Sequence, residues 1–344
     1  MSLLRDVPLQ PRPTDEDTLL DVRDLTVQYA TSSGSVLAVD KVSFTLGRGE
    51  FLGIVGESGC GKSTLLFGIA QLLSPPAGIT GGSAEFKGRN LVAMSDKELR
   101  PIRWAELSVV MQSAMNALNP VKTIAAQFRD VLKAHRFEGD IPTRSKEVMS
   151  LVGVDPVHLG SYPHQLSGGM RQRAMIAMAL LFTPDLIVMD EPTSALDVVA
   201  QRSLMMKIKE LQRELGFAII FVTHDMSLVS HFSDRLIVMY GGQIAELGDT
   251  RTVFDTPRHP YSQGLLEAFP SIRGPKVPLV GIPGSPPDLA TPPPGCRFAP
   301  RCPVVHDECG ATEPELYDVD QVLVRCLLHA PGAVNQAGSE EIPV

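Results

Sequence analysis

An α/β fold with a central parallel sheet is predicted by three stretches of this sequence. In each stretch a short apolar run, of the length typical of a strand, ends at residues able to bind or activate a ligand. The runs occupy residues 51–55, 186–189 and 217–222. Continuous apolar runs are typical of strands buried on both faces, and the carboxyl edge of such a sheet is where α/β proteins bind ligands.

The run 51–55 leads into a sequence that fits the phosphate-loop pattern G-x-x-x-x-G-K-[ST]. A helix with apolar periodicity begins near its lysine, and the loop consists of Gly56, Glu57, Ser58, Gly59, Cys60, Gly61, Lys62, Ser63 and Thr64. Glycines let successive backbone N–H groups turn toward one anion, and the positive end of the helix adds to the attraction. We expect Lys62 to reach the β- and γ-phosphates and Ser63 to take one position on Mg²⁺. A glycine-rich turn with an incidental lysine is the alternative, which the strand–loop–helix context disfavours.

Polar side chains that suit phosphate hydrolysis follow the other strands. Asp190 and Glu191 end an apolar run, where carboxylates are unfavourable unless they face a cation or a reacting water. We expect Asp190 to hold the Mg²⁺ shell and Glu191 to polarise the water. Gln112 is suited to bind Mg²⁺ or orient that water, and His224 to contact the γ-phosphate from the sheet edge. Each residue taken alone is equally compatible with an ordinary strand end.

The remaining elements are predicted from periodicity and from turn residues. Residues 19–46 predict short strands joined by a polar hairpin loop, and Tyr29 lies on one of them. Its ring is suited to stack on adenine, or it is a half-buried strand tyrosine. Prolines and glycines in 75–82 are expected to break the chain. Further strands are expected at 83–86 and 107–111, and helices at 63–73, 95–104, 123–134, 145–152, 170–182 and from about 198 to 215.

The segment 165–173, QLSGGMRQR, precedes a predicted helix. Ser167 offers an N-cap hydroxyl, and Gly168 and Gly169 leave N–H groups free at the helix start. This combination predicts a second anion site that has no lysine of its own. An ordinary helix cap is the alternative.

Taken together and in this order, the elements within about residues 19–257 resemble the nucleotide-binding subunit of ATP-binding cassette (ABC) transporters. The resemblance implies a P-loop NTPase of RecA-like core in a domain at 19–256, with an antiparallel β subdomain and a helical subdomain at about 113–182. It implies that Tyr29 stacks on adenine and that Gln112 forms the Q-loop. Glu191 corresponds to the catalytic glutamate and His224 to the switch histidine. The stretch 166–170 corresponds to the signature sequence and 194–197 to the D-loop.

The same resemblance implies how such a subunit works. Two ATPase subunits pair head to tail, and each ATP lies between the phosphate loop of one and the signature residues of the other. ATP binding closes the pair and hydrolysis reopens it, because ATP has a higher affinity for the closed state. The helical segment receives a coupling helix from the permease, and Gln112 links this contact to the nucleotide.

Composition limits the remaining possibilities. The chain has 344 residues with 44% hydrophobic residues, and its net charge of −8 argues against a nucleic-acid-binding surface covering the molecule. A soluble ABC ATPase acting on nucleic acid or ribosomes is the second class of function, but it usually needs two cassettes or a coiled-coil insertion. The longest apolar run has nine residues, 174–182, whereas a membrane span needs about 18. Together with the resemblance, this implies a subunit that is peripheral to the membrane, at its cytoplasmic face. We expect the N-terminus at 1–18 to be flexible.

The composition changes at about residue 257, and we expect an irregular extension over 257–344. Thirteen of the 28 prolines lie between 257 and 303, after a helix expected at 261–269. Without an export signal, cysteines are expected to be thiols or metal ligands and not disulfides. Paired C-x2–4-C knuckles are absent, so an iron–sulfur cluster suits the four cysteines of this region better than zinc does. These are Cys296, Cys302, Cys309 and Cys326. Zinc, or free thiols with a redox-sensing role, are the alternatives.

Three segments of the extension, 258–261, 283–287 and 295–303, resemble the C-terminal region of the oligopeptide/dipeptide/nickel branch of ABC importers. Some members of that branch carry a [4Fe-4S] cluster in this region. Relatives often have a histidine directly after the last cysteine, whereas here His329 follows Cys326 by three residues. The resemblance implies ATP-driven import of oligopeptides or dipeptides, with nickel chelates or oligosaccharides as alternative cargo. Its expected partners are a similar but different ATPase subunit, two permeases and an extracytoplasmic binding protein.

Overall fold

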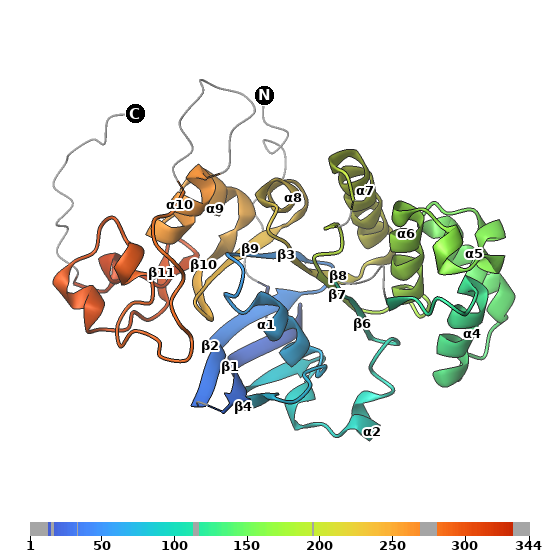
Figure 1. Ribbon diagram of the computed structural model, residues 1–344, viewed down its shortest axis with the longest axis horizontal. Helices are drawn as coiled ribbons and strands as arrows, with labels where there is room; N and C mark the ends of the chain where they lie inside the picture. The colour runs from blue at the N-terminus through green and yellow to red at the C-terminus, as the bar shows by residue number, and fades with distance from the viewer. Residues whose placement is uncertain are drawn as a thin grey trace.

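The computed structural model describes residues 13–14, 17–32, 34–112, 117–194, 196–268 and 281–332. The flexible N-terminus expected at 1–18 therefore lies largely outside the described residues. The described chain forms two sheets with helices around them (Figure 1). One sheet has four strands in the order β2-β1-β4-β5, and the other has eight in the order β11-β12-β10-β9-β3-β8-β7-β6.

The four-stranded sheet is antiparallel and forms the β subdomain. It consists of β1 (Thr18–Thr31), β2 (Gly34–Gly47), β4 (Ala77–Phe86) and β5 (Arg89–Asn90). The expectation of short strands in this region was wrong, because β1 and β2 have 14 residues each. The glycines expected to break the chain lie inside β4, where the pairing with β1 shifts register between Arg23 and Thr26. Gly82 has a φ of 84°, and a Cβ there would lie 2.4 Å from the backbone of Asp24, so glycine permits this bulge.

The eight-stranded sheet contains the predicted parallel core. Its parallel strands are β6 (Leu107–Val110), β7 (Leu186–Asp190), β8 (Ala218–Val222), β3 (Phe51–Val55) and β9 (Arg235–Tyr240). The strands β3, β7, β8 and β9 are buried along their whole length because helices cover both faces. Parallel pairing brings the carboxyl ends of β3, β7 and β8 to one edge, where the nucleotide-site residues follow.

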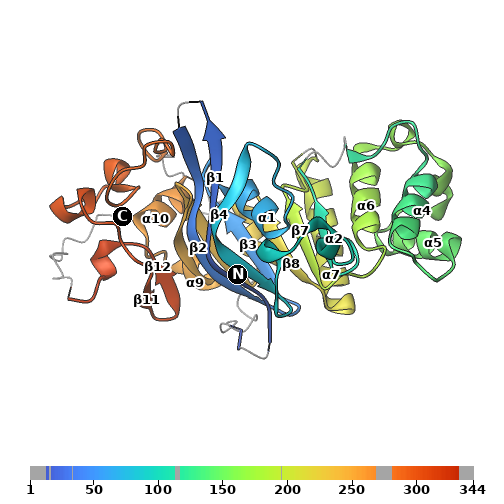
Figure 2. The ribbon, with the colours of Figure 1, turned by 90° about the horizontal axis from the view of Figure 1, so that it is seen from below.

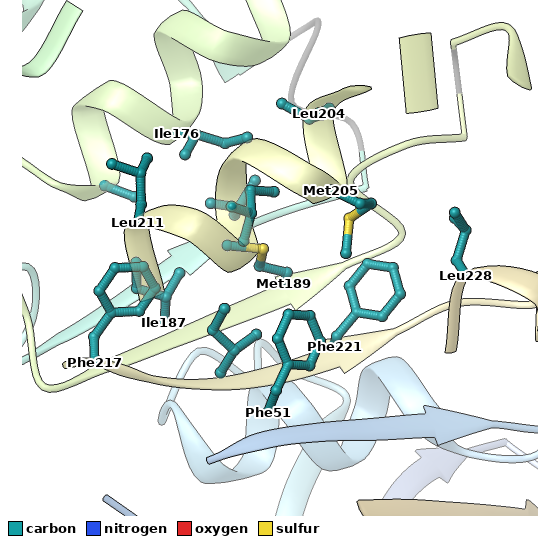
Figure 3. Close-up of a cluster of buried hydrophobic side chains, with 14 of the residues drawn as sticks. Phe51, Ile176, Ile187, Met189, Leu204, Met205, Leu211, Phe217, Phe221 and Leu228 are labelled. Carbon is teal, nitrogen blue, oxygen red and sulfur yellow. The ribbon is translucent and has the colours of Figure 1, made fainter. Parts of the chain in front are cut away.

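Two helices cover opposite faces of this core. On one face α1 (Lys62–Ile69) packs Leu65 and Ile69 into a buried cluster with Leu52. On the other, α7 (Val198–Leu215) covers the rings of Phe51 and Phe221, which meet edge to face with centroids 5.8 Å apart (Figure 3). The apolar strand residues thus alternate between two cores, which fixes the register of the sheet.

The predicted helical subdomain contains α4 (Ile124–Ala134), α5 (Ile141–Leu151) and α6 (Gly168–Ala179). The side chains of Thr123, Asp140 and Ser167 cap these helices by accepting a backbone N–H bond in the first turn. Between them lie the short 3₁₀ turns η2 (Pro156–Gly160) and η3 (Pro163–Gln165). The helix expected at 95–104 is only α2 (Asp96–Leu99), because Pro101 has no backbone N–H with which to continue the helical hydrogen bonds.

The described part of the extension has few regular elements, and two of its strands lengthen the main sheet. After α8 (Met226–Phe232) and β10 (Gln243–Asp249) come α9 (Thr250–Asp255) and α10 (Pro260–Glu267). The strands β11 (Tyr317–Val319) and β12 (Val322–Val324) then pair beyond β10, with Glu246 opposite Val324. Figure 2 shows the extension at the end of the molecule opposite to α4 and α5.

Candidate nucleotide site

The phosphate loop joins β3 to α1 in a conformation that requires glycine. Gly56 and Gly61 have φ values of 149° and 102°, and a Cβ on either would lie 2.2 Å from a backbone carbonyl oxygen, that of Met239 or Ala38. Any side chain at these positions would therefore displace the backbone around the loop. The loop is thus fixed by close packing against β2 and β9.

Lys62 and Ser63 begin α1 within this loop. The Lys62 ammonium donates to the carbonyl oxygens of Gly56 at 2.8 Å and Glu57 at 2.9 Å, so it lies inside the loop. The Ser63 hydroxyl donates to Asp190 Oδ1 at 3.0 Å. Asp190 is 2% exposed, and its burial raises its carboxyl pKa. A hydroxyl beside a buried carboxylate provides the kind of oxygen ligands that Mg²⁺ prefers.

Glu191 lies at the centre of a second polar group. Its carboxylate accepts a bond from Gln112 Nε2 at 2.8 Å, and its other oxygen lies 3.2 Å from His224 Nδ1. These residues follow three different strands, β7, β6 and β8. Glu191 also has a φ of 44°, a conformation that costs a residue other than glycine about 1–3 kcal/mol. Its N–H donates to the Val222 carbonyl at 2.9 Å, which stabilises this turn.

One cavity of about 550 Å³ joins the two groups. Ten of the residues predicted from the sequence line it: Tyr29, Ser58, Gly59, Gly61, Lys62, Ser63, Thr64, Gln112, Glu191 and His224. The Tyr29 hydroxyl lies 3.0 Å from Thr64 Oγ1, which connects β1 to α1. A cavity of this size suits a small ligand, and its polar groups converge from several strands.

Three residues of the predicted set support the site without lining this cavity. Gly56 provides a carbonyl to Lys62, and Asp190 contacts Ser63. Cys60 is 5% exposed, and burial raises its pKa, so it packs as a small apolar side chain. Their predicted place in the phosphate-loop region is therefore observed, whereas their roles toward a nucleotide stay predictions.

The signature residues do not reach the phosphate loop of their own chain. Ser167 caps α6 by accepting the Met170 N–H at 3.3 Å, and Gly168 begins that helix. Gly169 lines a separate cavity with Asp197, the N-cap residue of α7. The predicted anion site at 167–169 is accordingly not part of the nucleotide cavity of its own chain.

The cysteines of the extension meet at a different place. Cys296, Cys302, Cys309 and Cys326 all line one small cavity beneath His259 and Phe298. Among the described residues, however, no three His, Cys, Asp or Glu side chains converge closely enough to hold a metal ion. Neither the expected iron–sulfur cluster nor the zinc alternative is therefore confirmed.

Comparison with known proteins agrees with this geometry. Residues 39–194 match the ABC transporter family, and residues 245–309 match the oligopeptide/dipeptide transporter C-terminal region. The dipeptide transport ATP-binding protein DppD of Bacillus subtilis (strain 168) is 46% identical over 292 residues, which cover 83% of this chain and 87% of that protein. This chain belongs to the ABC transporter family.

Other relatives match along most of the chain. The oligopeptide transport ATP-binding protein OppD of Salmonella typhimurium is 43% identical over 318 residues, covering 91% of this chain and 94% of OppD. The solved dimer of the ATP-binding cassette MJ0796, bound to ADP and phosphate, is 29% identical with a TM-score of 0.61, covering 67% of this chain and 99% of that one. The resemblance inferred from the sequence, and the ABC-type ATPase fold it implied, are thereby confirmed. Within the described residues, no helix combines the length and apolarity that a membrane span requires.

Sequence reasoning missed several ABC site residues that the extension contributes. Leu289 lines the nucleotide cavity. Arg301 pairs with Glu57 of the phosphate loop, and Arg297 pairs with Asp40 behind it. Both arginines lie in the segment 295–303, GCRFAPRCP, which was the signal that the sequence offered. A single sequence does not show which carboxylates these arginines pair with.

Proposed function

We propose that this chain hydrolyses ATP to power the import of oligopeptides or dipeptides through a membrane ABC transporter. The observation that carries the proposal is the convergence of Glu191, Gln112 and His224 on the cavity that the phosphate loop lines. Relatives that match 83% and 91% of the chain are named as dipeptide and oligopeptide transport ATP-binding proteins, which supports peptides as the cargo. The match of residues 245–309 to the C-terminal region of such transporters supports the same cargo.

In this proposal each side chain acts on one part of the nucleotide. Tyr29 stacks on the base, and Lys62 together with the loop N–H groups binds the β- and γ-phosphates. Glu191 accepts a hydrogen bond from the attacking water and draws its proton away. His224 and Gln112 hold the Glu191 carboxylate in place, and His224 contacts the γ-phosphate.

Mg²⁺ is the cofactor expected for this chemistry, and it neutralises charge on the phosphates when bound. Ser63 and Asp190 suit it, since their oxygens lie side by side at the loop. Gln112 is the third candidate ligand, from the opposite side of the cavity.

A second ATPase subunit completes the site in this proposal. The residues Ser167, Gly168 and Gly169 are not part of the nucleotide cavity of their own chain, which suits binding of the nucleotide held by a partner. We propose that the partner is a similar but different subunit. Closure of this pair around ATP, and its opening after hydrolysis, would move two permeases fed by an extracytoplasmic binding protein.

The proposal places the chain at the cytoplasmic face of the membrane, with 19–256 as the ATPase domain and 257–344 as the extension. The segment at about 113–182 would receive the permease. Its exposed apolar side chains Val121 and Val157, 78% and 72% exposed, support a contact there.

Reconstitution tests this function. The chain is assembled in lipid vesicles with the second ATPase, permeases and binding protein encoded beside it. We expect ATP-dependent uptake of labelled di- and oligopeptides, and faster ATP hydrolysis when the binding protein carries peptide. Uptake of a nickel chelate or an oligosaccharide instead of peptide would transfer the function to the alternative cargo. Co-purification with ribosomes and not with permeases would remove transport altogether.

We also propose that the four cysteines of the extension bind a [4Fe-4S] cluster. Their side chains line one cavity, which supports this donor set. Among the described residues, no three of these side chains converge as closely as a zinc ion requires, since its sulfur ligands lie about 2.3 Å from one point. A four-iron cluster is larger, so its cysteine ligands stand farther apart. Burial raises the pKa of Cys326 to about 11, so ligation would release protons from the thiols.

Anaerobic purification with iron analysis and an absorbance spectrum tests the cluster. We expect about four iron atoms per chain and a brown protein, with iron lost in Cys302→Ser. A colourless, iron-free protein would contradict the cluster, and stoichiometric zinc would favour the alternative metal.

A further inference from the structure

The described extension, residues 281–332, reaches the nucleotide cavity at one place and the phosphate loop at another. Leu289 lines the cavity beside Tyr29 and Val36. Arg301 instead contacts the phosphate loop, through the carboxylate of Glu57. Both residues belong to the same stretch of chain, which leads into the cysteine cavity.

Arg301 is held rigidly between the extension and the loop. Its side chain is 4% exposed. Two N–H groups form a fork on Glu57, at 2.7 and 2.9 Å. The other three donate to the Tyr240 hydroxyl at 3.2 Å and to the carbonyl oxygens of Pro283 at 2.8 Å and Ile282 at 3.3 Å. Because all five donors are used, Arg301 has one well-defined position, and a bidentate guanidinium fixes the carboxylate it meets.

The backbone of Glu57 is held from the same side. Its N–H donates to the hydroxyl of Tyr261, a fully buried residue of α10, at 2.9 Å. The carbonyl of Glu57 accepts one of the bonds that position the Lys62 ammonium. A displacement of Glu57 would therefore move the cation that binds phosphate.

Leu289 is placed by backbone pairing. Its carbonyl accepts the N–H of Leu37 at 2.9 Å, on the outer side of β2, the edge strand of the β subdomain. Leu289 thereby lies next to Val36, and Val36 pairs directly with Tyr29 across the strands. Two apolar side chains and one aromatic ring therefore line the cavity together, which suits a flat base.

We propose that the extension is part of the nucleotide site, with Leu289 contacting the base and Arg301 acting as a positioning residue that sets the phosphate loop through Glu57. This inference rests on the proposed ATPase function and deepens it. The groups that act on the phosphates and on the attacking water remain those of the ATPase domain at 19–256: Lys62, the N–H groups of the phosphate loop, Glu191 and His224. The extension sets how tightly the two ends of the nucleotide are bound.

Two probes separate the two contacts. The full-length chain is titrated with Mg–ATP and with Mg–tripolyphosphate, which has phosphates but no base. Leu289→Ala should raise the Kd for ATP about three- to tenfold, by loss of apolar contact, and leave tripolyphosphate binding unchanged. Glu57→Gln and Arg301→Lys should each raise the Kd for both probes about tenfold. For these two variants the KM for ATP should rise more than the kcat falls.

The double variant and a control exclude a general loss of structure. If Glu57 and Arg301 act as one pair, the double variant should bind ATP no more weakly than the worse single variant, whereas independent damage would add. Asp320→Asn is the matched control, because Asp320 pairs with Arg258 in the extension at 2.8 Å, is 81% exposed and does not line the cavity. It should bind both probes as the unaltered chain does.

The outcomes distinguish failure of this inference from failure of the proposed ATPase function on which it rests. If the unaltered chain binds and hydrolyses ATP while Leu289→Ala and Glu57→Gln change neither Kd by more than about twofold, the extension has no part in the site and the ATPase proposal stands. If Leu289→Ala weakened the binding of Mg–ATP and of Mg–tripolyphosphate equally, the contact between Leu289 and the base would be refuted. If the unaltered chain does not hydrolyse ATP within its transporter, the ATPase function itself fails.

Discussion

The carboxylates of the nucleotide cavity and those that anchor the extension have opposite partners. Asp190 and Glu191 are paired with a hydroxyl, an amide and an imidazole, and neither meets an arginine or lysine side chain within ion-pair distance in the described structure. Asp40 is instead paired with the guanidinium of Arg297, and Glu57 with that of Arg301. A carboxylate with neutral partners remains available to a cation or a water, whereas one matched by a buried arginine fixes structure.

Glu191→Gln should give the largest effect, because it changes the chemistry and not the packing. We expect ATP turnover to fall by roughly 10²–10⁴-fold, since the amide cannot take the proton of the attacking water. Its partners are an amide and an imidazole and not a buried arginine, so the midpoint of thermal unfolding should change little. Phosphate release under saturating ATP measures the effect, and turnover equal to that of the unaltered chain would remove Glu191 from this role.

Arg297→Ala should have the opposite signature, a large effect on stability. The Arg297 side chain is 6% exposed, and it donates to Asp40 and to the Gly241 carbonyl. Removing one partner of a buried ion pair leaves the other charge uncompensated, at a cost of about 3–5 kcal/mol. Thermal unfolding of the nucleotide-free chain should therefore begin several degrees lower.

Lys122→Gln is the matched control for that variant. Lys122 pairs with Asp130 at 2.7 Å, but both side chains are 49% exposed. Exposed pairs contribute about 0–1 kcal/mol, so the midpoint should move by a degree or two at most. Equal destabilisation by both variants would contradict the contrast between buried and exposed pairs.

Glu246→Gln should give the smallest effect, and one that depends on pH. Glu246 is fully buried and accepts backbone N–H bonds from Arg258 at 2.8 Å and His259 at 3.1 Å, which join β10 to the extension. Burial raises its carboxyl pKa above the usual value of 4.5. The folded state therefore binds a proton that the unfolded state has released, and this contribution to stability is lost as pH rises above 4.5 through the folded pKa.

The measurement is the unfolding midpoint of Glu246→Gln and of the unaltered chain at a series of pH values. Glutamine does not titrate, so the variant should gain stability relative to the unaltered chain as pH rises above about 4.5, and the gain should level off once the pH has passed the folded pKa of Glu246. A difference that is constant across this range would show that Glu246 keeps an ordinary pKa in the fold.

The residues predicted for the nucleotide site converge in the structure, and they could be named from the sequence for a local reason. A phosphate loop must place its glycines, lysine and hydroxyl within one short turn, so the whole pattern appears in consecutive residues. The sequence also indicated Asp190, Glu191 and His224, because each lies at the end of an apolar run. Parallel strands bring the carboxyl ends of such runs together at one edge of the sheet. The convergence of Gln112 and His224 on Glu191 needed only the order of strands in the sheet.

The lengths of strands and helices were less accurate where long-range pairing overrode local signals. The glycines at 78–82 predicted a break, yet they lie in β4 because pairing with β1 continues through a bulge. The strands β11 and β12 gave no clear signal of their own, since each has three residues. β12 depends on β10 for its pairing, and β11 depends on β12.

The sequence by itself determined the chemistry of this protein: a phosphate-binding turn, a pair of acids and a histidine at strand ends, and four cysteines in a proline-rich extension. Only the tertiary structure decided that the extension returns to the nucleotide cavity, where Arg301 meets Glu57 across 244 positions of sequence. The physical reason is that local motifs are set by backbone geometry within a few residues. The partner of a buried charge is set by the packing of whole elements, which no neighbouring residue specifies.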